Sequence, residues 1–302
     1  MAPPESPAQR TSPLTPEELR QLHAVQLELL AEFDRICARL QLPYQIAAGT
    51  LLGAVRHGGF IPWDDDVDVI MRRADYERLL DEAPALLGEM FFLQCWRTDP
   101  GFQQFFAKLR RHGSRFRQVG EREAMHHGIF LDIFPLDAVA PDRRRWRFRY
   151  SCLRGSFTLV SALRRLALHP DKGNLSSAHP AWRQYLGPWL QRGLAVVPWW
   201  FWPAILDRLL RSMAALTDDR LTCLASGWMT MDRVRQLNRP VAEWEQTVLL
   251  PFEGRLLPAT ACYEQALARL YGDYRTPPPP DRRHPGHPVV EFALPASGER
   301  RA

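Results

Sequence analysis

The chain has 302 residues, of which 46% are hydrophobic and 24% charged, and its formal net charge is +5. This is ordinary globular composition, long enough for one large domain or for a catalytic core with an appended module. The five cysteines are scattered and include no C-x-x-C pair. The sequence therefore excludes a disulfide framework and a cysteine zinc cluster, and it indicates a reducing compartment.

No segment of the sequence predicts export or insertion into a membrane. The first 12 residues are rich in proline and contain no apolar core of a signal peptide. Residues 193–206 form the longest uncharged apolar stretch, but this stretch contains two prolines and is shorter than the roughly 20 residues that span a bilayer. We therefore predict a cytoplasmic protein.

A long helix begins the folded part of the sequence. Thr15 is predicted as the N-cap, Pro16 occupies the first helical position, and Glu18 completes a capping box. Apolar residues then recur at helical spacing up to the stop at Pro43, which predicts a helix with one buried face.

Residues 44–140 predict a sheet with helices packed on it. Short apolar or alternating runs predict strands, and two segments predict helices. Strands are expected at 44–48, 66–70, 91–96, 105–109 and 129–134, and helices at 51–56 and 75–87.

The second half of the chain has a different character. A helix with eight arginines is predicted over 142–169, and residues 181–216 are rich in tryptophan. A hairpin is predicted over 248–257 and a last helix over 259–271. We divide the chain into a disordered tail (1–13), an α/β catalytic core (14–140), a basic, Trp-rich, mainly helical subdomain (141–240), a C-terminal hairpin and helix that pack on the core (241–276), and a second disordered tail (277–302).

The strongest chemical signal is an acidic run. Asp64, Asp65, Asp66 and Asp68 place four carboxylates within five positions, where they repel one another unless a cation offsets their charge. Asp66 and Asp68 are two residues apart on a predicted strand, so both side chains leave the same face and can hold one Mg²⁺ or Mn²⁺ ion. The alternative is an acidic surface loop, which seldom continues into an alternating strand.

Two further segments are predicted to join this site. Gly49 and Thr50 lie between a predicted strand and a predicted helix, where glycine lets backbone N–H groups approach a phosphate. Asp132 interrupts an apolar strand, which is costly unless its carboxylate is paired or holds a cation. We predict Asp132 as a third metal ligand; the alternative is a structural aspartate bonded to backbone or to an arginine. Asp137 is predicted as a loop or capping residue.

Other polar residues are close to these elements in sequence. Arg56 and Lys108 are the first candidates for neutralising donor phosphates, and His57 and Asp64 are further candidates for substrate binding. The alternative for each of them is an ordinary charge on the solvated surface.

The chain resembles the LicD family, which includes bacterial phosphocholine transferases and is related to fukutin and fukutin-related protein. Residues 48–57 (AGTLLGAVRH) and 59–68 (GFIPWDDDVD) carry the closest resemblance. Residues 130–137 (FLDIFPLD) resemble a second block of the family, and 250–254 (LPFEG) with 271–274 (YGDY) resemble its C-terminal block.

The resemblance implies a nucleotidyltransferase fold, in which a mixed sheet is flanked by helices. Gly49 and Thr50 would form the phosphate-side turn, and Asp66, Asp68 and Asp132 would be the three acidic positions. It also implies a CDP-activated donor such as CDP-choline. Phosphocholine would move to a hydroxyl on a glycan or lipid-linked glycan, as in lipopolysaccharide biosynthesis, and CMP would be released.

Two further predictions concern a binding surface for choline and a membrane surface for the second half of the chain. An aromatic wall would face the choline ammonium, and Trp63 and Trp96 are candidates, although large aromatic residues are more often core. The arginines and tryptophans of 142–216 suit an anionic membrane surface at the inner face of the membrane, or else a helical subdomain with its tryptophans inside.

Two other functions stay open at this point. A nucleotidyltransferase would move a nucleoside monophosphate from a triphosphate to a small molecule and release pyrophosphate. A catalytically silent membrane- or glycan-binding protein would keep the fold alone, which the complete set of aspartates argues against. Nucleic acid is not expected as a partner, because the arginines are confined to one segment without a known binding motif.

Overall fold

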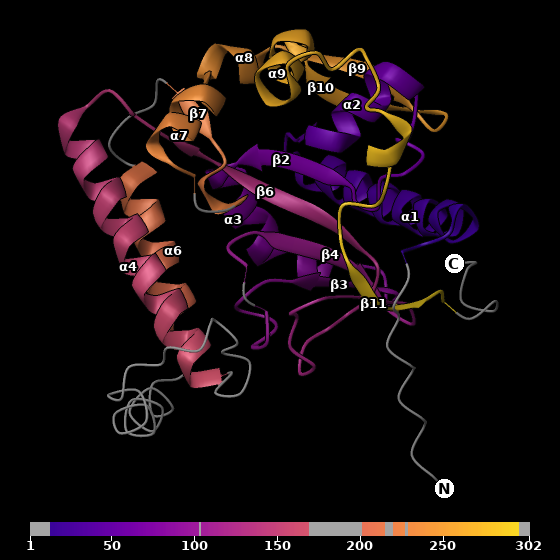
Figure 1. The fold of residues 1–302 in the computed structure, drawn as a ribbon, viewed down its shortest axis with the longest axis horizontal. Helices are drawn as coiled ribbons and strands as arrows, with labels where there is room; N and C mark the ends of the chain where they lie inside the picture. The colour runs from indigo at the N-terminus through magenta and orange to yellow at the C-terminus, as the bar shows by residue number, and fades with distance from the viewer. Residues whose placement is uncertain (1–12, 103, 169–200, 215–219, 227–228, 296–302) are drawn as a thin grey trace, which may run out of the picture.

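The structure of the protein is a computed structural model that describes residues 13–102, 104–168, 201–214, 220–226 and 229–295. A mixed sheet lies at the centre and is flanked by helices, and two long helices stand side by side at one end of it (Figure 1). The helices are α1 (Pro16–Leu40), α2 (Ala48–His57), α3 (Arg73–Glu82), α4 (Arg144–Leu168), α6 (Phe201–Ala214), α7 (Met231–Leu237), α8 (Val241–Glu245) and α9 (Tyr263–Tyr271), with 3₁₀ turns at Ala83–Ala85, Leu224–Ser226 and Pro280–Arg282. The strands are β1 (Gln45–Ile46), β2 (Asp68–Arg72), β3 (Phe91–Gln94), β4 (Ala107–Arg111), β5 (Arg115–Gln118), β6 (Phe130–Ala138), β7 (Arg220–Thr222), β8 (Arg239–Pro240), β9 (Thr247–Phe252), β10 (Arg255–Thr260) and β11 (Val289–Ala293).

The central sheet has the spatial order β1-β2-β6-β4-β3. The pair β2 and β6 is parallel, whereas β1 pairs with β2, and β4 with β6 and β3, in antiparallel fashion. The far end of β6 also pairs with β7, which continues to β8. The predicted α/β class with a mixed sheet is therefore confirmed.

Helix α1 covers one face of this sheet. The Thr15 side chain accepts a hydrogen bond from the Glu18 N–H, and the Glu18 carboxylate accepts one from the Thr15 N–H, as a capping box requires. Leu22, Leu29 and Phe33 are fully buried in the core beneath the helix. Each such side chain contributes about 1.5–3 kcal/mol through burial, so the predicted helix is fixed chiefly by packing.

Two elements of the predicted site begin at other residues than expected. Helix α2 begins at Ala48, so Gly49 and Thr50 lie in its first turn and not in a turn before it. Strand β2 begins at Asp68, so Asp66 lies in the loop that enters the strand. The strand continues to Arg72, further than the predicted strand, and its residues from Asp68 to Met71 are all buried.

The C-terminal part of the chain packs beside α2. The hairpin β9–β10 and helix α9 both contact α2 (Figure 1). The predicted disordered tail over 277–302 is wrong for its described part, because β11 pairs with β5 in antiparallel fashion. Glu291 of β11 is buried and forms ion pairs with Arg115 and Arg117 of β5, which explains why this strand adds to the molecule.

Helices α4 and α6 are joined to the core through a second apolar cluster. Trp146 and Tyr150 stack with ring centroids 5.1 Å apart and lie buried at the end of β6. Residues 169–200, which contain most of the predicted Trp-rich segment, lie outside the described residues. None of the described helices is long and apolar enough to cross a bilayer.

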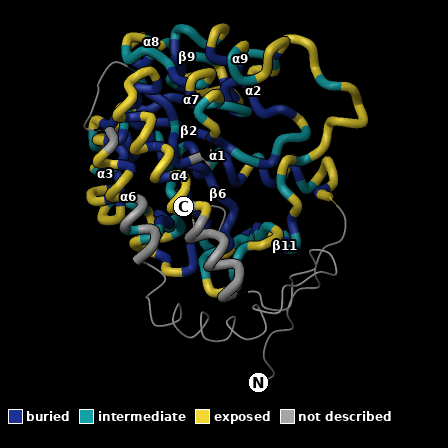
Figure 2. The backbone as a smooth tube through the Cα atoms, turned by 60° about the vertical axis from the view of Figure 1, so that its left-hand side comes forward, coloured by how far each residue is buried: buried dark blue, intermediate teal, exposed yellow. Residues whose placement is uncertain are grey.

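A buried ion pair ties α3 to the sheet. Asp137 lies inside β6 and is fully buried, so its prediction as a loop or capping residue is wrong. The Arg73 guanidinium donates to both of its oxygens, at 2.8 and 3.0 Å, and Asp207 of α6 lies 3.7 Å from the same arginine. Figure 2 shows β2 and β6 as buried strands, with exposed positions on the surrounding helices and loops.

Candidate active site

The parallel pairing of β2 and β6 brings Asp68 and Asp132 side by side. The two residues lie opposite each other in the register of the strands, and both are buried. The Asp132 N–H donates to the Val67 carbonyl (2.8 Å), and the Asp68 N–H donates to the Thr50 hydroxyl (2.8 Å). Paired positions of neighbouring strands share one face, so both side chains leave the same side of the sheet. Thr50 holds the backbone of Asp68, and its predicted contact with phosphate stays a prediction.

The first turn of α2 lies against Asp64. A Cβ at Gly49 would overlap the Asp64 carboxylate, so this close approach requires glycine. The preceding Ala48 has φ 44°, a left-handed conformation that costs about 1–3 kcal/mol in a residue other than glycine. The N-cap Ala47 provides no side-chain hydrogen bond to the helix. An anionic ligand can therefore approach the first N–H groups of α2.

The acidic residues of the run raise one another's pKa. Burial, with the charges of Asp66 and Asp65, raises the pKa of Asp64 to about 8. Burial raises the pKa of Asp66 to about 6, although His287 acts in the opposite direction. Burial and the charges of Asp66 and Asp132 raise the pKa of Asp68 well above its ordinary value. A bound divalent cation would reverse this effect, because it stabilises the ionised carboxylates.

Lys108 is the direct partner of Asp132. It lies opposite Asp132 in the register of β4 and β6, and its Nζ lies 2.7 Å from Asp132 Oδ1. Lys108 and Asp132 therefore form a buried ion pair, and the ammonium of Lys108 compensates the charge of this carboxylate. Burial lowers the pKa of Lys108, and the Phe130 ring centroid lies 3.3 Å from its Nζ. Lys108 therefore neutralises a protein carboxylate here, and its predicted role toward donor phosphates stays a prediction.

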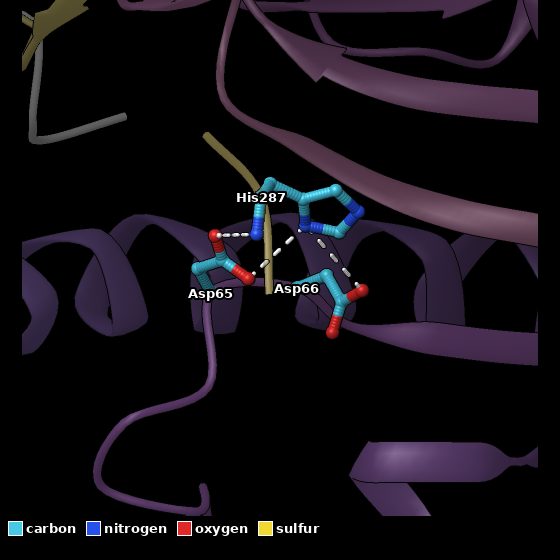
Figure 3. Close-up of side chains that lie close together, drawn as sticks. All are labelled: Asp65, Asp66 and His287. Carbon is cyan, nitrogen blue, oxygen red and sulfur yellow. Dashed lines mark hydrogen bonds and ion pairs between the residues drawn. The ribbon is translucent and has the colours of Figure 1, made fainter. Parts of the chain in front are cut away.

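A second group of potential metal ligands was not predicted. Asp65, Asp66 and His287 place one ligand atom each within 4.8 Å of one another, whereas Asp66, Asp68 and Asp132 form no such group in the described part of the chain (Figure 3). Asp65 is already saturated, because it accepts hydrogen bonds from the Gly286 and His287 N–H groups and lies 3.1 Å from His287 Nδ1. We therefore regard Asp65 as the anchor of the C-terminal segment.

The negative charges of Asp66, Asp68 and Asp132 suit a divalent cation, but their oxygens are not gathered around one point. The charge of Asp66 raises the pKa of Asp68, and the charge of Asp132 contributes to the pKa shifts of both. Asp132 is buried as well, and its Oδ1 faces the Lys108 ammonium at 2.7 Å. Crowded carboxylate oxygens are the donor set that Mg²⁺ prefers.

Arg56, His57 and Trp63 form a basic and aromatic edge beside the acidic run. The guanidinium carbons of Arg56 and Arg283 lie 6.0 and 5.2 Å from the Trp63 ring centroid, and His57 meets the same ring edge-on at 6.1 Å. Arg56 also donates to the Tyr274 carbonyl (3.0 Å). Arginines already contact the Trp63 ring, which disfavours Trp63 as a wall for choline.

Trp96, the other candidate for a choline wall, contacts Arg97 and not the acidic run, whereas Tyr271 lies near the acidic residues. Trp96 is contacted by Arg97 (5.6 Å), whose guanidinium binds Glu77 of α3. Tyr271, at the end of α9, is 44% exposed. Burial of its phenol and the charges of the acidic run, first of all that of Asp68, raise the pKa of Tyr271. Tyr271 therefore lies at the mouth of the site.

The loop that carries the acidic run is held from two sides. The Glu253 carboxylate, at the tip of the β9–β10 hairpin, accepts from the Phe60 N–H (3.1 Å), and a Cβ at Gly59 would overlap this carboxylate. From α1, a ring nitrogen of His23 lies 2.8 Å from the Asp64 carbonyl, and Gln26 donates to the Asp65 carbonyl (2.9 Å).

Sequence analysis did not assign a role to four residues near the acids: Tyr271, Glu253, Arg283 and His287. The first two lie in segments 250–254 and 271–274, whose resemblance to the LicD C-terminal block is a usable signal. The other two lie in a proline-rich segment that carries no local signal.

A mixed sheet with aspartates on two adjacent parallel strands, beside a helix N-terminus, defines a nucleotidyltransferase-type domain. Residues 41–145 match the sequence model of the LicD/FKTN/FKRP nucleotidyltransferase domain. These residues, which include the acidic run and the β2–β6 pair, form a LicD-type nucleotidyltransferase domain.

Two relatives extend this finding. The chain is 25% identical over 288 residues to the lipopolysaccharide cholinephosphotransferase LicD of Haemophilus influenzae, an alignment that covers 91% of this chain and 98% of that protein. It is 42% identical over 172 residues to an uncharacterized protein of Rickettsia typhi, covering 52% of this chain and 46% of the relative. The predicted family is confirmed, and the similarity to the Haemophilus protein includes the second half of the chain.

Proposed function

We propose that the chain is a phosphotransferase that moves a phosphoalcohol, phosphocholine before others, from a CDP-activated donor to a hydroxyl of a glycan or lipid-linked glycan and releases CMP. The observation that carries this proposal is the crowding of Asp64, Asp66 and Asp68 beside the first turn of α2. The phosphocholine cargo and a lipopolysaccharide acceptor are supported by the name of the Haemophilus relative.

The residues of the site would divide the work as follows. Asp66, Asp68 and Asp132 would hold a divalent cation, Mg²⁺ or Mn²⁺, which supplies charge neutralisation at the diphosphate. The N–H groups at the start of α2 would face the anionic donor phosphates. Asp132 would also orient the acceptor hydroxyl, while Lys108 keeps its carboxylate ionised.

The transfer itself exchanges one phosphorus–oxygen bond for another. The acceptor hydroxyl oxygen bonds to the phosphorus of the phosphoalcohol, the bond from this phosphorus to the CMP oxygen breaks, and the hydroxyl proton goes to Asp132. Buried Lys108 beside Asp132 would stabilise the ionised carboxylate before transfer. The negative charge that develops on CMP would face Arg56 and the N-terminus of α2.

The rival activities use the same carboxylates but give other products. A nucleotidyltransferase would release pyrophosphate from a nucleoside triphosphate, and a silent binding protein would release nothing. The buried ion pair between Lys108 and Asp132 disfavours a silent protein, because a buried charge pair costs desolvation energy that a purely structural sheet can avoid.

The test is CMP release from CDP-choline, CDP-ribitol and CDP-glycerol, with Mg²⁺ or with EDTA, in the presence of a lipid and glycan extract. We expect metal-dependent CMP release from one donor, reduced about 10²- to 10³-fold in Asp68→Asn. Asp232→Asn, at an exposed position of α7, is the matched control and should keep full activity. Pyrophosphate release from a nucleoside triphosphate, without turnover of any CDP compound, would replace the proposal by its rival.

The exposed face of α4 supports a further part of the proposal, namely that the protein works at the anionic inner surface of a membrane. Phe148 is 71% exposed. The arginines around it have no ion-pair partner among the described residues. Basic residues beside an exposed aromatic side chain are typical of a membrane interface. The arginines of this exposed face are Arg144, Arg145, Arg147, Arg149 and Arg154.

A further inference from the structure

A cavity of about 240 Å³ lies on the active-site face of the sheet. Asp68, Ile70 and Phe134 from β2 and β6 line it, together with the first turn of α2 and Leu270 of α9. Asp68 therefore belongs both to the acidic cluster and to the cavity, so a molecule held at the cluster can extend into the cavity. A cavity of this size has room for a single ring.

Two arginines line the same cavity, and only one of them is compensated. Arg269 of α9 forms two hydrogen bonds with the Glu243 carboxylate. The side chain of Arg239 in β8 has no hydrogen-bond or ion-pair partner in the described part of the chain. Burial lowers the pKa of Arg239, and the neighbouring charge of Arg269 lowers it further, whereas Glu243 acts in the opposite direction. The cavity thus presents an unsatisfied guanidinium to whatever fills it.

The residues that line the cavity favour some chemical groups of a donor or an acceptor over others. A trimethylammonium group would lie beside the guanidinium groups of Arg239 and Arg269, whose positive charges disfavour a cation there. A polyol would need many hydrogen-bond partners, and most of the lining is apolar. A flat heteroaromatic ring can pack against Phe134 and Ile70 and offer acceptors on its edge to a planar guanidinium.

We propose that this cavity binds the nucleobase of the donor and that Arg239 donates to two adjacent acceptors on its edge, O2 and N3 of cytosine. Uracil offers O2 beside an N–H donor, so it satisfies only half of the guanidinium fork. The inference rests on the proposed function for its choice of a cytidine donor. The inference goes beyond that function, because it places the cytosine in this cavity and names Arg239 as the residue that selects it.

The experiment measures binding of CMP, UMP and ribose 5-phosphate to the full-length protein by calorimetry in Mg²⁺. We expect the wild type to bind CMP more tightly than UMP or ribose 5-phosphate. Arg239→Met should weaken CMP binding by about 10- to 100-fold, the size of a lost charged hydrogen bond, and leave ribose 5-phosphate within about 3-fold. Arg235→Met, on the neighbouring helix α7 and outside the cavity, is the matched control. Arg239→Lys keeps the charge without the fork, and thermal unfolding of each variant checks that it folds.

The outcomes separate this inference from the proposed function. If folded Arg239→Met keeps the preference for CMP over ribose 5-phosphate, the base binds elsewhere and the inference fails, while cytidine donors stand. If Arg239→Met loses ribose 5-phosphate equally and Arg239→Lys restores both ligands, Arg239 binds a phosphate and the inference fails. If the wild type binds none of the nucleotides, the proposed donor class fails and the inference with it.

Discussion

The active site and the outer face of α4 use charged side chains in opposite ways. At the site, Lys108 and Asp132 are buried, lie opposite each other in the sheet register and form an ion pair at 2.7 Å. On α4, arginines such as Arg147 and Arg149 are exposed and have no ion-pair partner among the described residues. The first arrangement fixes charges in position, and the second leaves them available to something outside the chain.

The difference has an energetic consequence. A buried charge must be compensated within the protein, so removing its partner destabilises the fold by several kcal/mol. An exposed charge is solvated and screened by salt, so its removal costs little stability and changes only what the surface attracts. The comparison can therefore be tested by matched substitutions in the two regions.

The largest effect on folding is expected for Arg73→Met. This substitution leaves Asp137, which is fully buried and bound by the Arg73 guanidinium at 2.8 and 3.0 Å, without its cation. We expect the free energy of unfolding in urea to fall by about 3–5 kcal/mol. Arg78→Met removes a surface pair with Glu82 and should cost less than about 1 kcal/mol. Similar losses in the two variants would remove the distinction between buried and exposed charges.

The same distinction explains which parts of the fold could be predicted. The capping box at Thr15 and the apolar spacing of α1 are local signals, so the helix was expected where it lies. Asp68 and Asp132 stand out because each interrupts an apolar strand, and their pairing across β2 and β6 follows once both strands join one sheet. A charged residue inside an apolar run is visible in the sequence, and it indicates a buried charge that a partner or a cation must compensate.

No local pattern in the sequence predicts the contacts between distant segments. The pairing of β5 with β11 joins residues that are more than 170 positions apart, and the proline-rich approach to β11 hides a short strand. The contact between Asp65 and His287 depends on the same segment. The local pattern predicts Asp137 as a loop or capping residue, because the sequence does not reveal the contact with Arg73. Long-range partners of this kind are set by tertiary packing, which local patterns do not contain.

An intermediate effect is expected from acid at a half-buried pair of histidines. A ring nitrogen of His126 lies 2.9 Å from one of His112, and its Nδ1 accepts from the Gly128 N–H (3.1 Å). Burial and the nearby His112 lower the pKa of His126 to about 4. Below its ordinary pKa of about 6.5 the unfolded chain binds a proton that the folded protein resists, so stability present at neutral pH is lost as pH falls toward 4.

The measurement is the free energy of unfolding in urea at about pH 7.5 and about pH 5. In His126→Gln the difference between the two should shrink by about 1–2 kcal/mol, less than the full pKa shift implies because the ring is partly exposed. His284→Gln, at an exposed position, should leave the difference unchanged. An equal pH dependence in wild type and His126→Gln would show that this histidine does not couple folding to acid.

The smallest effect on folding, with a distinct effect on binding, is expected on α4. Each arginine-to-glutamine change on its exposed face should alter the free energy of unfolding by no more than about 0.5 kcal/mol. Flotation with vesicles that contain phosphatidylglycerol should show binding that weakens about 10²-fold in the triple variant, at about 1 kcal/mol for each arginine near an anionic surface. The triple variant is Arg144→Gln, Arg147→Gln and Arg154→Gln, and its control is Arg20→Gln, Arg39→Gln and Arg78→Gln on α1 and α3.

The control variant removes the same net charge from two other helices, α1 and α3, so it separates a local surface from general attraction. Vesicles of phosphatidylcholine alone should bind neither protein, because they lack the anionic headgroups that the arginines would contact. Phe148→Ala should weaken binding further without changing its dependence on salt, since an apolar ring adds insertion and not charge. If both triple variants lose binding equally, the exposed arginines of α4 have no special role, and their lack of partners would reflect only that they are solvated.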